Sequence, residues 1–274
     1  MSERLISYGD ESHAVRESSN PVNAKPILPA IRKIGLRDLR SALTAGIEDF
    51  LAMPSHVVFL SIIYPIFGLF VALISADHDV MPLLIPLTTG FALIGPFAAL
   101  GLYELSRRRE LGLDVSWKHA FSVWHSPSRN SIAVLAIALL TILLAWLFVA
   151  HALYRFLHVD PMVSLPRFAY SLFTTSQGQT LLIVGGASGF LFATVVLATS
   201  VVSFPMLLDR NIGAGAAVLT SLRAVRSNPV PIALWGLIVA ASLAFGSLPL
   251  FVGLAVVMPV LGHATWHLYR RLIN

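Results

Sequence analysis

Six long apolar stretches without a charged side chain constrain this sequence more than any other feature. They lie at 57–76, 82–103, 131–153, 180–208, 230–247 and 249–268, and none contains Asp, Glu, Lys or Arg. About 20 apolar residues in a helix cross a hydrocarbon core about 30 Å thick. Because backbone groups in lipid must satisfy their own hydrogen bonds, such stretches form helices. We therefore predict an all-α, polytopic membrane helix bundle with six transmembrane helices within residues 31–274.

The composition supports a membrane protein and excludes several other classes. Charged residues make up 12% of the chain and hydrophobic residues 56%, whereas soluble domains carry about 25% charged residues. The chain has no cysteine, which excludes disulfides, thiolate metal sites and a cysteine nucleophile. The net charge of +5 is typical of cytoplasmic loops facing anionic lipid, and we expect no nucleic-acid partner. Residues 1–30 are polar, and we expect a disordered tail.

The basic residues predict the orientation of the bundle. With six spans, 17 of the 19 Lys and Arg residues fall on one side of the membrane, and only Arg155 and Arg167 fall on the other. Cytoplasmic segments carry the excess of Lys and Arg. We therefore expect a multi-pass protein with cytoplasmic N- and C-termini. The long external segment at 154–179 is expected to contain a short interfacial helix near 166–175.

A segment ahead of the first span has the apolar spacing of an amphipathic helix. Its apolar positions recur every three or four residues, at Leu36, Leu39, Leu43, Ile47 and Phe50. We expect this N-terminal helix to lie on the membrane or to pack on the bundle; docking to a partner is the alternative. Basic residues placed to contact anionic lipid headgroups are Arg32, Lys33, Arg37 and Arg40.

Two segments resemble each other when they are aligned on Pro96 and Pro259. Residues 90–108 and 253–271 share glycine, alanine, proline, leucine and two final arginines at matching positions. Both run in the same direction through the membrane in the six-span topology. Each odd-numbered span also follows a short cytoplasmic segment that ends in a proline, at Pro54, Pro127 and Pro229. Together these features suggest three parallel helical hairpins, formed by successive pairs of spans; chance similarity between apolar segments is the alternative. Gly185 and Gly189 form a small-residue step that lets helices approach closely.

The strongest candidate polar site lies at the cytoplasmic ends of the spans. His263 and His267 share one helix face because they are four residues apart, and Glu104 and Asp209 end two other spans at a similar depth. Two histidines and two carboxylates can bind a divalent metal. The alternative is that these side chains cap helices and join them by hydrogen bonds. Nucleotide-binding and hydrolase motifs are absent from the sequence, so we expect no catalytic residue and no cofactor.

The absence of acidic and basic residues within the spans bears on function. Transporters of charged substrates usually place an ionisable group inside the membrane, and this absence argues against a pump, a proton antiporter or a voltage sensor. We expect a membrane scaffold or assembly partner that is not an enzyme and that contacts another membrane protein complex. A channel or transporter for a small neutral or apolar solute is the alternative. Its path would be lined by Thr88, Thr89, Ser188, Thr194, Thr199 and Ser200.

Several runs of the sequence resemble a family of bacterial membrane proteins. These runs are IRKIGLRDLRSALTAGIEDFLAMP, IYPIFGL, GFALIGPFAALGLYELSRR, SFPMLLDR and MPVLGHATWHLYRRL. They are similar to the family known as domain of unknown function 2189, from about residue 31 to the C-terminus. The resemblance implies a polytopic protein of the bacterial inner membrane. It brings no established activity and no catalytic residues.

Overall fold

The computed structural model describes residues 28–53, 65, 68–69, 86, 89–90, 92–158, 165–248 and 252–273. Apart from a single antiparallel bridge between Ile31 and Ile273, every element in these residues is a helix, as the sequence predicted. The elements are α2 (Leu36–Ala52), η3 (Ala92–Ile94), α5 (Gly95–Ala98), α6 (Leu100–Glu110), η4 (Trp117–His125), α7 (Arg129–Phe156), α8 (Leu165–Thr174), α9 (Ser176–Ser200), α10 (Ser203–Asp209), α11 (Ala214–Ser227), α12 (Pro229–Ser247) and α13 (Leu254–Leu272).

Three helical stretches in the described residues are long and apolar enough to cross a membrane. They are α7, the α9–α10 stretch from Ser176 to Asp209, and α12. They coincide with the predicted spans at 131–153, 180–208 and 230–247. Large apolar side chains on these helices point outward, as with Phe148 on α7 and Phe190 on α9, which are 74% and 75% exposed. In a membrane, lipid covers such faces.

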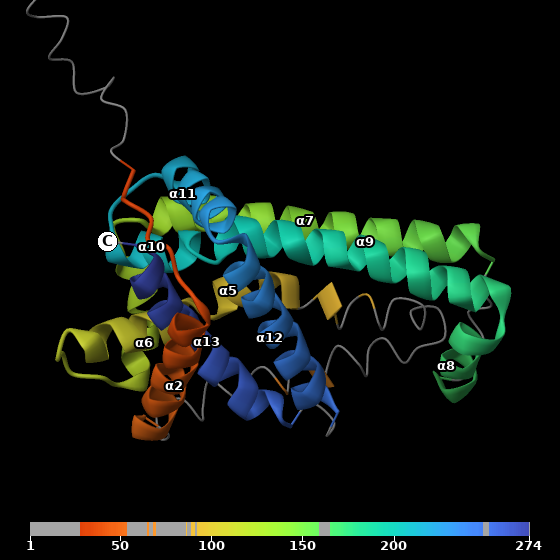
Figure 1. Ribbon diagram of the computed structural model, residues 1–274, viewed down its shortest axis with the longest axis horizontal. Coiled ribbons are helices and arrows are strands. Elements are labelled where there is room, and N and C mark those ends of the chain that lie inside the picture. The colour runs from red at the N-terminus through yellow and green to blue at the C-terminus, as the bar shows by residue number, and fades with distance from the viewer. Residues whose placement is uncertain are drawn as a thin grey trace, which may run out of the picture.

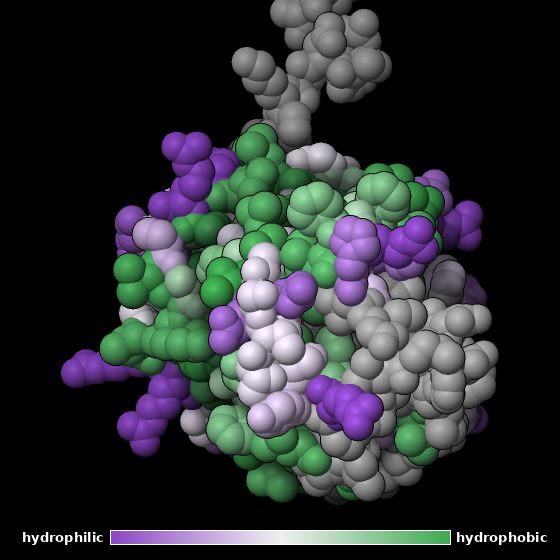
Figure 2. All heavy atoms as spheres, turned by 90° about the vertical axis from the view of Figure 1, so that its right-hand side faces the viewer, coloured by the Kyte–Doolittle hydropathy of each residue, from purple (hydrophilic) through white to green (hydrophobic). Residues whose placement is uncertain are grey.

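α7 and α9 run along the long axis of the molecule, whereas α12 runs at a steep angle to them in this view (Figure 1). α7 and α9 pack side by side, α8 lies at one end, and α2, α6, α10 and the C-terminus gather at the other. Figure 2 views the molecule from the α8 end and shows hydrophobic surface around much of its rim, interrupted by hydrophilic side chains. The helix predicted near 166–175 is present as α8.

Small residues set the spacing between the long helices, as predicted for Gly185 and Gly189. A Cβ atom added to Gly189 of α9 would lie 3.2 Å from the ring of Trp146 on α7, and one added to Gly185 would lie 3.6 Å from Leu153. The indole Nε1 of Trp146 donates a hydrogen bond to the carbonyl of Pro86 at 2.9 Å. The glycines of α9 therefore accept the large side chains of α7.

Two of the predicted spans are interrupted in the structure. Within 92–103 the chain forms η3, α5 and the first turn of α6 as separate elements, with Pro96 in the first turn of α5. The 180–208 span breaks between α9 and α10, where Pro205 lies in the first turn of α10. Proline lacks an N–H donor and disturbs the preceding turn. Ser221 of α11 bridges the second break: its hydroxyl donates to the carbonyl of Ala198 and accepts from the N–H of Val202.

The first predicted span and the tail fall largely beyond what the structure describes. Residues 1–27 and nearly all of 57–76 lie outside the described residues. The sixth predicted span corresponds to α13, which continues through Pro259 and packs against α12 and α2. The six-span count and the three hairpins therefore remain predictions, although α7 packs on α9 and α12 packs on α13.

Both ends of the described chain are joined through Asn228 at the α11–α12 junction. The N–H of Arg32 donates to the carbonyl of Leu272 at 2.8 Å. The buried amide of Asn228 donates to the carbonyl of Arg32 at 3.0 Å and accepts from the N–H of Ile34 at 2.9 Å. Because all three segments are distant in sequence, this side chain fixes the approach to α2 against the rest of the bundle.

Candidate functional site

The candidate site is built on the buried face of α2. Four residues of this helix are buried, namely Leu39, Ala42, Gly46 and Asp49. The sequence predicted the amphipathic helix but not its buried face. Leu36 and Ile47, which belong to the expected apolar stripe, are 64% and 46% exposed. The small residues Ala42 and Gly46 face inward instead, and this lets α2 approach α13 closely.

Gly46 is the point of closest approach between α2 and α13. A Cβ atom at this position would lie 2.6 Å from both the Cβ and the backbone nitrogen of Ala264. Two residues earlier in α13, a Cβ atom on Gly262 would lie 2.6 Å from the side chain of Leu102 at the start of α6. The backbones of α2 and α13 are thus in near contact, with α6 packed alongside.

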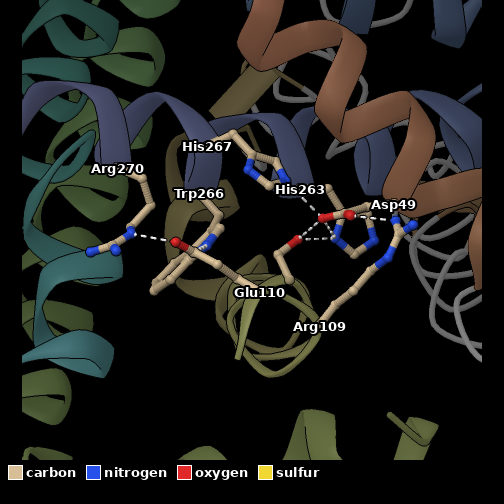
Figure 3. Close-up of polar contacts among 8 residues, drawn as sticks. Asp49, Arg109, Glu110, His263, Trp266, His267 and Arg270 are labelled. Atoms are coloured by element: carbon tan, nitrogen blue, oxygen red, sulfur yellow. Dashed lines mark hydrogen bonds and ion pairs between the residues drawn. The ribbon is translucent and has the colours of Figure 1, made fainter. Parts of the chain in front are cut away.

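The carboxylate of Asp49 is the centre of a polar cluster that joins these three helices (Figure 3). Its Oδ2 atom accepts from Ser106 Oγ of α6 at 2.5 Å and from His267 Nε2 of α13 at 2.9 Å. Its Oδ1 atom accepts from Arg109 Nη1 at 2.6 Å. Asp49 itself is only 5% exposed. One carboxylate therefore ties α2 to both α6 and α13.

His263 completes the cluster and is fully buried. Its Nδ1 atom lies 2.6 Å from Ser106 Oγ and 3.9 Å from Asp49 Oδ2. A hydroxyl has a single proton, and Ser106 donates it to Asp49, so Nδ1 must carry a proton and donate to Ser106. Ser106 thus lies between the carboxylate and the imidazole, and His263 is not arranged to withdraw a proton from it. The Nε2 atom of His263 has no hydrogen-bonding partner in the described residues.

The partners of Asp49 lower its pKa. Burial alone would raise the pKa of this carboxyl, but the hydrogen bonds from His267 and Ser106 favour the charged form and outweigh burial. The net effect is a pKa below the ordinary value of 3.8. The carboxylate is therefore ionised throughout the neutral range.

This shift predicts an acid dependence of stability. A lowered pKa in the folded state contributes stability that is fully present above the unfolded value of 3.8 and is lost as pH falls toward the folded value. We expect the difference in thermal midpoint between the wild type and Asp49→Asn to narrow below that pH. Unfolding in detergent, followed by circular dichroism across acid pH, measures this difference. A difference in thermal midpoint that stays constant at every pH would contradict the lowered pKa of Asp49.

A second polar group lies on the neighbouring face of α13. Trp266 Nε1 and Arg270 Nε each donate to the carboxylate of Glu110 at the end of α6, both at 2.9 Å. Tyr269 donates to Asp209 Oδ2 at 2.6 Å. Burial and this hydrogen bond raise the pKa of Tyr269, so it remains a donor. This second group joins α13 to α6 and α10, and Figure 3 shows the contacts to Glu110.

The four residues proposed as metal ligands do not converge. Glu104 pairs with Arg107 and Arg108 of its own helix, at 3.3 and 3.9 Å. Asp209 contacts Tyr269 and Arg270. The remaining two, His263 and His267, meet at Asp49. Within the part of the chain that the structure describes, no group of three or more His, Cys, Asp or Glu side chains is arranged to hold a metal ion.

Sequence reasoning missed the role of Asp49. The carboxylates Glu48 and Asp49 both fell between apolar positions of the helix and looked equivalent. The signal that separates them is the spacing from the small residues, since Asp49 is three residues after Gly46 and seven after Ala42. A face of small residues that ends in a carboxylate indicates a close helix contact closed by a polar group.

The basic residues proposed to contact lipid headgroups have different surroundings. Arg32, Arg37 and Arg40 are exposed, as such contacts require. Lys33 is exposed too, but its Nζ atom donates to the carbonyl of Ser227 at 2.5 Å. Lys33 therefore helps to hold the N-terminal segment on α11, and its amine is partly engaged within the protein.

Comparison with known proteins identifies a membrane family over the middle of the chain. Residues 84–209 match the model of a family described as a predicted integral membrane protein (DUF2189). This confirms the resemblance seen in the sequence, over a shorter range than residues 31 to the C-terminus. Ser106 and Arg109 lie inside the matched range, whereas Asp49 and both histidines lie outside it. No curated protein and no solved structure showed significant similarity to the chain.

Proposed function

From the match to a family of integral membrane proteins, we propose that this chain is a non-catalytic scaffold or assembly partner in the bacterial inner membrane. It crosses the membrane six times, with both termini in the cytoplasm, and holds another membrane protein complex. The observation that carries the proposal is the use of two polar groups at the basic end. The carboxylates of Asp49, Glu110 and Asp209 accept hydrogen bonds that join α2, α6, α10 and α13 to one another.

The charges along α7 support the proposed orientation. Arg129 begins the helix and Arg155 lies near its other end, about 39 Å away at 1.5 Å per residue. This separation exceeds a hydrocarbon core of about 30 Å, so both charges reach the headgroups. Arg167 lies on α8, at the same end as Arg155 (Figure 1). The basic residues of α2, α6 and α13 lie at the opposite end, which the six-span topology assigns to the cytoplasm.

The hydroxyl groups of α9 favour a scaffold over a channel. Ser188, Thr194 and Thr199 were proposed to line a solute path. Each instead donates to a carbonyl of its own helix, at 2.9, 2.8 and 2.8 Å respectively. Ser200 also donates within the helix, to Val196. Thr89 donates to the carbonyl of Pro86, and Thr88 lies outside the described residues. Hydroxyls engaged in this way offer solute few donors.

Solute flux distinguishes the proposal from its alternative. The purified protein is reconstituted in liposomes, and the uptake of glycerol and urea is followed by stopped-flow light scattering. We expect rates equal to those of protein-free liposomes, because the α9 hydroxyls are satisfied within their helix. Protein-dependent flux that falls in Thr194→Val and Ser188→Ala, with Thr141→Val on α7 as the matched control, would contradict the scaffold and support a channel.

A further inference from the structure

The segment between α6 and α7 carries a row of exposed aromatic side chains. η4 places Trp117, Phe121 and Trp124 on its surface, and they are 40%, 45% and 70% exposed. The rings of Trp117 and Phe121 are in edge-to-face contact, with centroids 6.1 Å apart. In the sequence this segment falls within a connection between two spans. A group of neighbouring exposed aromatic side chains is typical of a surface that contacts a membrane or another protein.

The opposite face of η4 fixes the depth at which these side chains lie. Ala120 is buried against α6, where a Cβ atom on Gly101 would lie 3.0 Å from the Cβ of Ala120. Gly101 belongs to the end of the predicted span 82–103. At the other end of η4, Trp124 precedes Arg129, the first residue of α7, by only five residues. The middle of η4 at Ala120 and its end at Trp124 therefore both lie near the positions where predicted spans leave the hydrocarbon.

The charges beside this row suit an anionic surface. Lys118 of η4 and Arg129 at the start of α7 are both exposed. Trp side chains prefer the headgroup level because one part of the ring system is apolar and the N–H is polar. Lys and Arg extend beside them to lipid phosphates. The combination of aromatic and basic side chains at this depth fits lipid better than an apolar protein surface.

A matching pair of aromatic side chains lies at the far end of the bundle. Tyr170 and Phe173 of α8 are 70% and 68% exposed, and α8 lies at the opposite end of α7 from α6 (Figure 1). α7 has 28 residues, which corresponds to about 42 Å. A bilayer with its headgroup regions is about 40–45 Å thick. The two aromatic groups are thus separated by about one membrane thickness.

We propose that Trp117, Phe121 and Trp124 are seated in the headgroup layer of the leaflet that α7 enters, with Lys118 and Arg129 on the phosphates of anionic lipids. η4 is then a membrane anchor that fixes the depth of α6 and α7. The proposal depends on the insertion of α7 in the membrane and is independent of whether the protein acts as a scaffold.

The absence of native cysteines allows a direct test of this depth. Four single-cysteine variants are labelled with an environment-sensitive fluorophore and placed in lipid nanodiscs. W124C reports on η4, and F121C is a second probe of the same row. L144C on α7 is the deep reference. L111C is the aqueous reference, because Leu111 is exposed and directly follows α6. It lies ten residues after Gly101, about 15 Å along the helix.

We expect nitroxides on lipid headgroups to quench the labels at 124 and 121 at least about twofold more strongly than the label at 111. Nitroxides at mid-chain should quench the label at 144 most. A larger proportion of phosphatidylglycerol in the nanodisc should increase the headgroup quenching of the label at 124. The double substitution K118Q and R129Q should remove this dependence on phosphatidylglycerol. Equal aqueous exposure at 124, 121 and 111 would overturn the proposal. So would protection at 124 in native membranes but not in nanodiscs, which would indicate a protein on η4.

Discussion

Replacing Asp49 by alanine is expected to lower the stability of the folded protein by about 2–4 kcal/mol. The carboxylate accepts hydrogen bonds from Ser106 and His267. Without it, Ser106 keeps only its contact with His263 among the described residues, and His267 loses the hydrogen bond to Asp49. The ion pair with Arg109 adds less, because that side chain is 41% exposed and water replaces the carboxylate. The measurement is thermal unfolding in detergent, followed by circular dichroism and by retention of the monodisperse peak in size-exclusion chromatography.

Two further variants separate the role of Asp49 from a general sensitivity of α2. Asp49→Asn keeps the shape and one acceptor but loses the charge, and we expect a smaller loss of about 1–2 kcal/mol. Glu48→Ala removes the neighbouring carboxylate, which is exposed, and should leave stability unchanged within about 0.5 kcal/mol. Equal losses for Asp49→Ala and Glu48→Ala would show that the polar cluster does not stabilise the junction of α2, α6 and α13.

Gly46→Ala is expected to destabilise the protein, although this change usually favours a helix. Alanine in a helix interior is normally more stable than glycine by about 0.5–1 kcal/mol. Here the added Cβ would lie 2.6 Å from the backbone nitrogen of Ala264, and a backbone atom cannot move aside as a flexible side chain can. We expect a loss of about 1–3 kcal/mol for Gly46→Ala and a larger loss for Gly46→Leu. The same unfolding measurement in detergent detects both.

Gly215→Ala is the matched control for this substitution. Gly215 lies in α11, and no atom lies within 4 Å of the Cβ that would be added. Its replacement should leave stability unchanged or raise it by up to about 1 kcal/mol. If Gly46→Ala behaves like Gly215→Ala, then α2 and α13 are not in backbone contact, and the junction described here is wrong.

The length of the apolar stretches predicted the helices that are long enough to cross a membrane. α7, the α9–α10 stretch and α12 were identified because a helix long enough to cross a membrane needs a run of apolar residues, whatever its neighbours are. α8 was predicted within a residue of its observed end at Thr174. The glycines of α9 were assigned correctly to close packing, since Gly189 accepts the ring of Trp146. These inferences depend on local sequence alone.

The contacts between distant segments were not predictable in the same way. The break after Ser200 depends on Pro205, but its repair depends on Ser221 from α11. Small residues line the buried face of α2, because α13 approaches most closely at Gly46. A stripe of apolar residues gives no information on the distance between two helices. The histidines of α13 were placed together correctly, but their carboxylate partner came from α2 and not from Glu104 or Asp209.

The central claim is that the chain acts by holding another membrane protein, with its polar end used as a structural joint. Native mass spectrometry of the protein, released from its own membranes in mild detergent at natural abundance, tests this claim most directly. We expect a particle in which the 29.7 kDa chain is bound to a second membrane protein at fixed stoichiometry, together with lipid. Release of the chain with lipid alone, and with no second protein bound, would contradict the claim.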